Sequence, residues 1–110
     1  MKDVILQCFI TYPDKKSAEK TIDILLRKNL IACGQIAGTI KSKYRWEKNI
    51  ETAKEILVIV KTRKSLWKNF TKTIKENHPY KVPEIIGIKS EKVDNDYLKW
   101  FFENTGGENV

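Results

Sequence analysis

Two prolines fix the course of the chain around its only histidine. The run at 78–86 reads His-Pro-Tyr-Lys-Val-Pro-Glu-Ile-Ile, so Pro79 and Pro83 both stand just before an apolar segment. Pro79 lacks an amide hydrogen and pushes His78 away from helical angles, so a helix is expected to end here. Pro83 is tolerated at the first residue of a strand but not inside a central one, so a strand should begin there. A helix therefore passes into a strand through a stiff turn with an imidazole at its corner.

The length of the chain limits it to one domain. With 110 residues it can bury a single hydrophobic core but not two. We expect one domain over residues 1–104 and a flexible tail over residues 105–110. The sequence holds no run of eighteen apolar residues, and its start does not resemble a signal peptide. It therefore predicts no membrane span and a cytoplasmic location.

Apolar spacing in the first half predicts a strand, a helix and a second strand. Residues 4–10 form a nearly continuous apolar run that is typical of a buried strand. Ala18, Ile22, Leu25 and Leu26 then fall on one helical stripe, and Asn29 is expected to end this helix. From residue 30 to residue 46 the alternation favours a long strand, which Gly34 and Gly38 would bend.

The middle of the chain predicts a long hairpin. The polar segment Glu47-Lys48-Asn49 joins the bent strand to a strand that ends in the apolar run at 56–60. Both arms exceed the usual five or six residues, and an arm that projects past its own core is only marginally stable alone. The run at 56–60 is also apolar on both sides, so one sheet face would stay exposed. Burial of that face between subunits is the expected solution.

The remaining elements complete a known plan. Ser65 is expected to cap a helix that ends at the proline turn, and residues 84–89 should form the last strand. Asp94 or Asn95 would cap a short closing helix. The order is strand, helix, strand, strand, helix, strand, which predicts an α+β, ferredoxin-like βαββαβ sandwich with an extra C-terminal helix. Right-handed crossovers would place both main helices on one face of the sheet.

The formal charge of +7 suggests a nucleic-acid partner, but the strands argue against one. An RNA-recognition domain shares this strand order and needs aromatic side chains on its central strands, whereas the run at 56–60 has none. Charge alone speaks to solubility and non-specific attraction. The chain also has no Gly-rich phosphate loop, paired-carboxylate motif or Ser/His/Asp arrangement. We therefore expect neither a specific nucleic-acid partner nor an enzyme.

Six short motifs follow one another along the chain. They are Thr11-Tyr12-Pro13-Asp14, Ala32-Cys33, Tyr44-Arg45-Trp46, Lys61-Thr62, the run at 78–86, and Asp96-Tyr97-Leu98-Lys99-Trp100. In this order they resemble the CutA family, which is linked to divalent-cation tolerance, and the resemblance extends from about Val4 to Trp100. It implies a homotrimer interlocked partly through the long hairpin, and likeness to the PII signalling proteins. It also implies a divalent cation such as Cu²⁺ as ligand, a role in metal tolerance or response, and an unidentified protein partner.

The metal site that the resemblance implies is incomplete in this chain. Some relatives carry two adjacent histidines before the Pro-Tyr pair and a cysteine before the Thr-x-Pro-Asp turn, where this chain has Asn77, His78 and Ile10. Copper prefers imidazole and thiolate donors, so His78 is the candidate ligand, and a single imidazole should bind only weakly. The alternative for His78 is a structural hydrogen-bonding role. Cys8 and Cys33 are the other candidate donors, although their apolar neighbours favour buried, inert thiols.

Tyr44 and Trp46 form the second candidate site, because strand alternation places them on the same side. They either pack in a core or interface, or form one wall of an inter-subunit cleft that Lys61, Tyr80 and Glu84 complete. Such a cleft would take a small molecule or an ion. Glu84 has a structural alternative as the ion-pair partner of Lys61. The alternative function is accordingly a small-ligand-binding regulatory trimer without a physiological metal.

Overall fold

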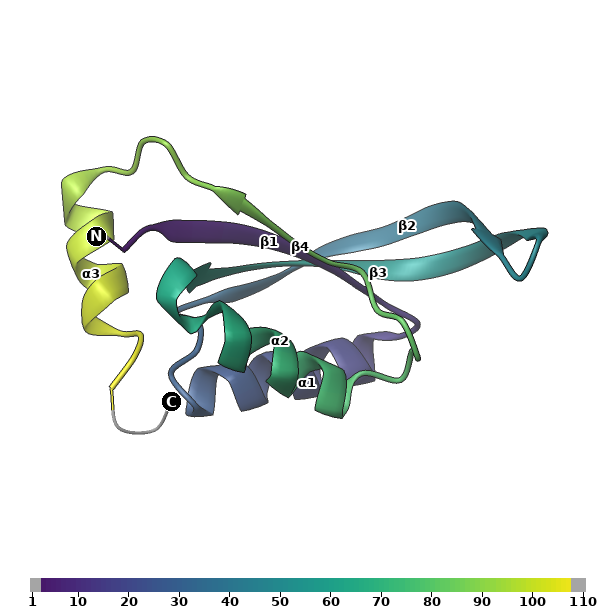
Figure 1. Ribbon diagram of the computed structural model, residues 1–110, viewed down its shortest axis with the longest axis horizontal. Coiled ribbons are helices and arrows are strands. Elements are labelled where there is room, and N and C mark those ends of the chain that lie inside the picture. The colour runs from purple at the N-terminus through teal and green to yellow at the C-terminus, as the bar shows by residue number, and fades with distance from the viewer. Residues whose placement is uncertain (1–2, 108–110) are drawn as a thin grey trace.

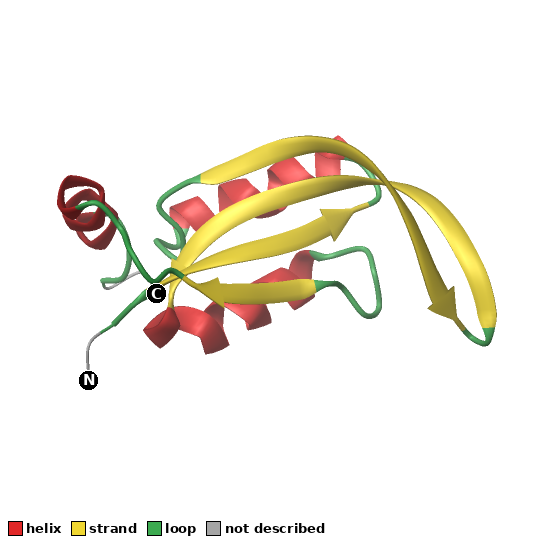
Figure 2. Cartoon of the chain, turned by 90° about the horizontal axis from the view of Figure 1, so that it is seen from above, coloured by secondary structure: helices red, strands yellow, loops and turns green. Residues whose placement is uncertain are grey.

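The computed structural model describes residues 3–107 and confirms the ferredoxin-like order of elements. The described elements are β1 (Ile5–Tyr12), α1 (Lys15–Arg27), β2 (Gly34–Trp46), β3 (Asn49–Arg63), the 3₁₀ turn η1 (Lys64–Leu66), α2 (Trp67–Asn77), β4 (Ile85–Lys89) and α3 (Asn95–Glu103). The strands form one antiparallel sheet in the order β2-β3-β1-β4. Helices α1 and α2 cover the same face of this sheet, as predicted, and the opposite face carries no helix over most of its area (Figures 1 and 2).

The core lies between the sheet and helices α1 and α2. Its buried side chains are Cys8, Ile10, Tyr12, Ala18, Ile22, Leu25, Leu30, Ile31, Val58, Val60, Phe70 and Ile74. The strand residues in this set alternate along β1 and β3, and the helical ones repeat at three- and four-residue spacing, so each element buries one face. The other face of β1, β3 and β4 is also apolar, and Ile86 and Ile88 there are each 51% exposed. That second apolar surface is the open face of the sheet.

The segment at 30–33, which was predicted to be strand, is a loop. Asn29 has a positive φ of 57° at the end of α1, and the amide of Leu30 donates a hydrogen bond back to the carbonyl of Leu25. This left-handed residue turns the chain sharply. Leu30 and Ile31 are buried in the core without being strand residues. Their apolar character thus reflects packing, and β2 begins only at Gly34.

The hairpin is longer than its neighbours in the sheet. β1 pairs with β3 from Arg63 only as far as Ile56, so residues 49–55 of β3 pair with β2 alone. Glu47 and Lys48 form the turn with φ of 48° and 71°, both positive as in tight two-residue hairpin turns. Gly38, with φ of 139°, lies at a register irregularity in β2 and confirms the predicted bend there. The outer hairpin therefore projects beyond the body of the protein as a two-stranded ribbon (Figure 1).

Two predicted boundaries were wrong by one residue each. Ser65 does not cap α2, because η1 precedes that helix and Ser65 instead hydrogen-bonds to the carboxylate of Asp3 through its amide and its hydroxyl. β4 starts at Ile85 rather than Glu84. Asp94 is the N-cap of α3, as expected, and accepts a hydrogen bond from the amide of Asp96.

The end of the described chain is attached to β3 through Arg63. Its guanidinium donates to the carbonyl of Phe102 and to both oxygens of Thr105. Thr105, the first residue of the predicted tail, is buried, and the amide of Gly106 donates to the carbonyl of Asn29. Residues 108–110 of the predicted tail lie outside the described residues. No helix within residues 3–107 is long and apolar enough to cross a membrane.

Candidate functional site

His78 is held where α2 ends by two hydrogen bonds. Its Nε2 lies 2.8 Å from the carbonyl oxygen of Thr11, and its Nδ1 accepts from the amide of Tyr80 at 3.0 Å. Since the amide must donate to Nδ1, the ring proton is on Nε2 and the imidazole is neutral. The ring also stacks on Tyr12, with centroids 4.3 Å apart. Burial lowers the pKa of His78, although the Thr11 carbonyl and the charge of Glu55 act in the opposite direction.

The residues present do not fit a copper site held by one protomer. Both nitrogens of His78 are engaged, so neither offers a free lone pair to a metal. Cys8 is fully buried, and burial raises the pKa of its thiol to about 12, which disfavours the thiolate that copper prefers. Asn77 donates its amide to the carbonyl of Thr73. Residues 3–107 contain no cluster of three or more His, Cys, Asp or Glu side chains suited to a metal.

Cys33 differs from its expected burial. It lies in the loop before β2 and is partly exposed, because the segment that was predicted to bury it is not a strand. Its Sγ is 3.8 Å from the hydroxyl oxygen of Tyr97 and 3.9 Å from Nζ of Lys61. These neighbours tie the loop to α3 and β3, but they bring no imidazole or second thiol to the sulfur.

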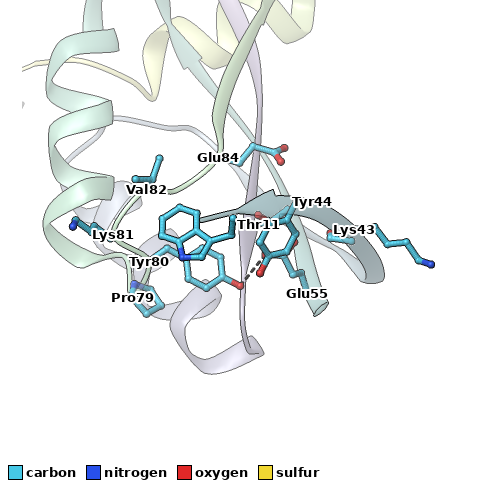
Figure 3. Close-up of a pocket in the computed structure, with 11 residues that line it drawn as sticks. Thr11, Lys43, Tyr44, Glu55, Pro79, Tyr80, Lys81, Val82 and Glu84 are labelled. Atoms are coloured by element: carbon cyan, nitrogen blue, oxygen red, sulfur yellow. Dashed lines mark hydrogen bonds between the residues drawn. The ribbon is translucent and has the colours of Figure 1, made fainter. Parts of the chain in front are cut away.

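A groove beside the outer half of the hairpin collects four of the five predicted cleft residues. Tyr44, Trp46, Tyr80 and Glu84 line a cavity of about 570 Å³ (Figure 3). Its other lining residues are Thr11, Ser42, Lys43, Glu55, Pro79, Lys81 and Val82. We call this cavity the hairpin groove. The stiff turn between α2 and β4 forms one side of it, and the two hairpin arms form the other.

The hairpin groove opens on the sheet face that the helices leave uncovered. Tyr44 pairs across the hairpin with Glu51, and Trp46 pairs with Asn49. Residues directly opposite in a ladder share a face, and alternation places Glu55 with them. Val58 and Val60 of the core therefore point to the other side of β3. Tyr44 and Trp46 thus lie on the same side of β2, as predicted, and that side belongs to the open face.

Lys61 lies apart from the hairpin groove. It is on the inner half of β3, donates a hydrogen bond to the side-chain oxygen of Gln35 at 3.0 Å, and reaches toward Cys33. It does not line the groove and makes no ion pair with Glu84 within the described residues. One protomer therefore joins four of the predicted cleft residues and leaves out the fifth.

Glu55 is the groove residue that the sequence did not reveal. It is only 7% exposed, and its Oε2 accepts a hydrogen bond from the hydroxyl of Tyr80 at 2.8 Å. Burial, this bond and the negative charge of Glu55 together raise the pKa of Tyr80 above its ordinary value. A lone carboxylate just before the apolar run at 56–60 was the available signal. Its partner is 25 residues away, so the pattern alone could not assign it a role.

Comparison with known proteins finds a family match that spans nearly the whole chain. The family model described as CutA1 divalent ion tolerance protein matches residues 6–104. The divalent-cation tolerance protein CutA of Pyrococcus horikoshii is 46% identical over 97 residues, which cover 88% of this chain and 94% of that protein. The structure of the divalent cation tolerance protein CutA1 from Thermus thermophilus superposes with a TM-score of 0.90 at 32% identity, covering 93% of this chain and 99% of the other.

A third similar protein bears on the predicted location. The structure described as the periplasmic divalent cation tolerance protein CutA from Archaeoglobus fulgidus has a TM-score of 0.87 at 36% identity, covering 91% of this chain and 97% of that one. A relative with the same fold is thus described as periplasmic, so the cytoplasmic location stays a prediction.

Proposed function

Because the chain belongs to the CutA1 divalent ion tolerance protein family, we propose that it acts in divalent-cation tolerance as a homotrimeric ligand-binding protein. Its ligand binds in the hairpin groove, which a neighbouring subunit completes. The protein is regulatory rather than catalytic, in the manner of the PII-like trimers that the sequence motifs suggested. Ligand occupancy is passed on through the subunit interface to a protein partner.

The hairpin groove carries this proposal, because side chains from distant parts of the chain meet in it. Side chains from the end of β1, from both hairpin arms and from the turn before β4 line one cavity, although they are up to 73 residues apart in the chain. Its volume of about 570 Å³ falls within the range of about 300–1,000 Å³ that is usual for small-molecule sites. Three aromatic side chains and two carboxylates give it both apolar walls and polar anchors.

The open face of the sheet supports the trimer. Ile86 and Ile88 on β4 are half exposed, and Phe9 and Leu57 lie on the same face of the neighbouring strands. An apolar surface of this kind marks an interface. Ile50 in the unsupported part of the hairpin is 63% exposed, which is also unfavourable for an isolated chain. Packing of the open faces against one another would bury both surfaces and would enclose the hairpin groove.

The geometry of His78 favours a ligand other than protomer-bound copper. The imidazole serves to fix the turn that places Tyr80 and Glu84 at the groove, because its two nitrogens bind Thr11 and Tyr80. Substitution of His78 should therefore lower the free energy of unfolding and leave Cu²⁺ binding unchanged. The protein would then act in divalent-cation tolerance through the ligand in the hairpin groove and not by holding copper at His78.

Native mass spectrometry of the gently purified protein tests this function. We expect a trimeric ion that carries a bound small molecule in the wild type, and we expect Tyr80→Ala to lose the molecule while remaining trimeric. Tyr97→Ala is the matched control, because Tyr97 is an exposed tyrosine on α3 outside the groove. It should retain the molecule.

Calorimetric titration with Cu²⁺ provides the opposing outcome. We expect weak heats that are the same in the wild type and in His78→Ala. Tight, stoichiometric Cu²⁺ binding that disappears in His78→Ala would show that the imidazole is a metal donor, and the proposed function would be wrong.

A further inference from the structure

The carboxylate of Glu55 is buried without a counter-ion. Glu55 is 7% exposed, and within residues 3–107 its carboxylate accepts a single hydrogen bond, from Tyr80. The ion pair within residues 3–107 joins Arg63 to Asp3 at 3.7 Å, so no Lys or Arg side chain described in the same protomer pairs with Glu55. A buried carboxylate is unfavourable unless it is paired. In a chain with 21 Lys and Arg residues, this missing partner points to an external cation.

Aromatic rings form the walls beside this carboxylate. Tyr44 and Trp46 are 44% and 43% exposed, so they are accessible to a ligand rather than packed in the core. Tyr80 approaches from the turn before β4 and directs its hydroxyl at Glu55 (Figure 3). The faces of aromatic rings are negative and attract cations, most strongly where water is excluded.

The lysines that line the groove do not neutralise it. Lys43 and Lys81 are both exposed, and Figure 3 shows their amino ends directed away from Tyr44, Tyr80 and Glu55. Glu84 adds a second carboxylate to the lining. An anion would therefore meet Glu55 and the ring faces, whereas a cation would be attracted by both.

We propose that the hairpin groove binds an organic ammonium cation, with Glu55 as its counter-ion and the rings of Tyr44, Trp46 and Tyr80 as its walls. This inference rests on the groove being the ligand site, as proposed above. A bare metal ion would use few of these groups, because ring faces supply no donor atoms and the cavity is much larger than an ion. An alkylammonium group uses the charge and the apolar walls together.

Three probe molecules of similar size test the effect of charge. Choline carries a trimethylammonium group, 3,3-dimethylbutan-1-ol replaces it with a neutral tert-butyl group, and 3,3-dimethylbutanoate combines the tert-butyl group with a negative charge. Titration calorimetry on the purified full chain should show choline binding at least about tenfold more tightly than the neutral alcohol. The butanoate should bind more weakly than either.

Variants then assign the charge to Glu55. In Glu55→Gln, choline affinity should fall at least about tenfold, to the level of the neutral alcohol, whose own affinity should stay unchanged. Glu76→Gln is the matched control, since Glu76 is exposed on α2 and does not line the groove. It should leave both affinities as in the wild type. If Glu55→Gln does not fold, the comparison of the three probes on the wild type still decides.

Each failure has a distinct meaning. If the neutral alcohol or the butanoate binds as tightly as choline, the ammonium inference is wrong while the groove remains a ligand site. If none of the probes binds, the inference is also wrong. The native mass spectrometry described above then shows independently whether another molecule occupies the groove.

Discussion

At the scale of single residues, His78 connects two distant parts of the chain. Its ring joins the carbonyl of Thr11, 67 residues earlier, to the amide of Tyr80. The neutral tautomer makes both bonds, whereas a protonated ring could no longer accept from Tyr80. His78 thereby fixes the turn that forms one side of the hairpin groove.

The pH dependence of stability should follow from this arrangement. Burial lowers the pKa of His78 below its ordinary 6.5 in the folded protein, so the unfolded chain takes up the proton first as the pH falls. His78 therefore contributes stability above pH 6.5 that is lost as the pH falls through the folded-state pKa. Urea unfolding at a fixed protein concentration, at about pH 7.5 and about pH 5.5, should show a smaller unfolding free energy at the lower pH.

The variant His78→Asn provides the control for that experiment, because Asn can still accept from the amide of Tyr80 but does not titrate. His78 is the only histidine in the chain, so a histidine titration between these two pH values is that of His78. The variant should lose most of the change between the two pH values. A wild-type stability that rises on acidification, or a variant as sensitive as the wild type, would contradict the assignment.

The sequence placed Tyr44 and Trp46 on one side of their strand, because alternation along a strand is a local property. Tyr80 and Glu84 also line the hairpin groove, because the turn between α2 and β4 carries both. Lys61 does not line it, since it is six residues along β3 from Glu55, about 20 Å at roughly 3.3 Å per residue. Glu55 itself was missed because its partner Tyr80 comes from another element.

At the scale of elements, helix α1 has one buried face and one exposed face, and two adjacent leucines lie on different faces. Leu25 is fully buried between α1 and the sheet, while its neighbour Leu26 is 39% exposed. The sequence assigned both leucines to one apolar stripe. The structure separates them, because adjacent positions differ by about 100° around a helix.

The two leucines make a matched pair for a stability test. Leu25→Ala leaves a cavity in the core and should lower the unfolding free energy by about 2–5 kcal/mol. Leu26→Ala removes the same atoms from a partly exposed position and should change it by no more than about 0.5 kcal/mol. Equal losses in the two variants, measured by urea unfolding, would mean that the assigned faces of α1 are wrong.

Element boundaries were predictable where a residue forces the backbone, and less so elsewhere. Pro79 ends α2 at Asn77 as expected, because proline restricts the residue before it. The loop at 30–33 was taken as strand, since apolar residues buried in a loop resemble those in a strand. The positive φ of Asn29 turns the chain so that residues 30–33 form a loop and not a strand. The tertiary contacts of this loop were not visible in the sequence.

At the scale of the whole molecule, the chain has two apolar sheet faces but helices for only one of them. The fold, the hairpin and both helix positions followed from sequence patterns, because each depends on local periodicity and on chain connectivity. In the proposed trimer, a second copy of the chain would cover the open face. Both the hairpin groove and the unsupported ribbon of the hairpin lie beside that face, so the proposed ligand site would depend on this assembly.

The molar mass of the intact protein in solution tests that dependence most directly. Multi-angle light scattering at micromolar concentration should give about three times the chain mass of 12.8 kDa, because the open faces and hairpins would be buried together. A mass of 12.8 kDa would mean that the open face and the hairpin remain exposed in a stable single chain, and the proposed inter-subunit site would not exist.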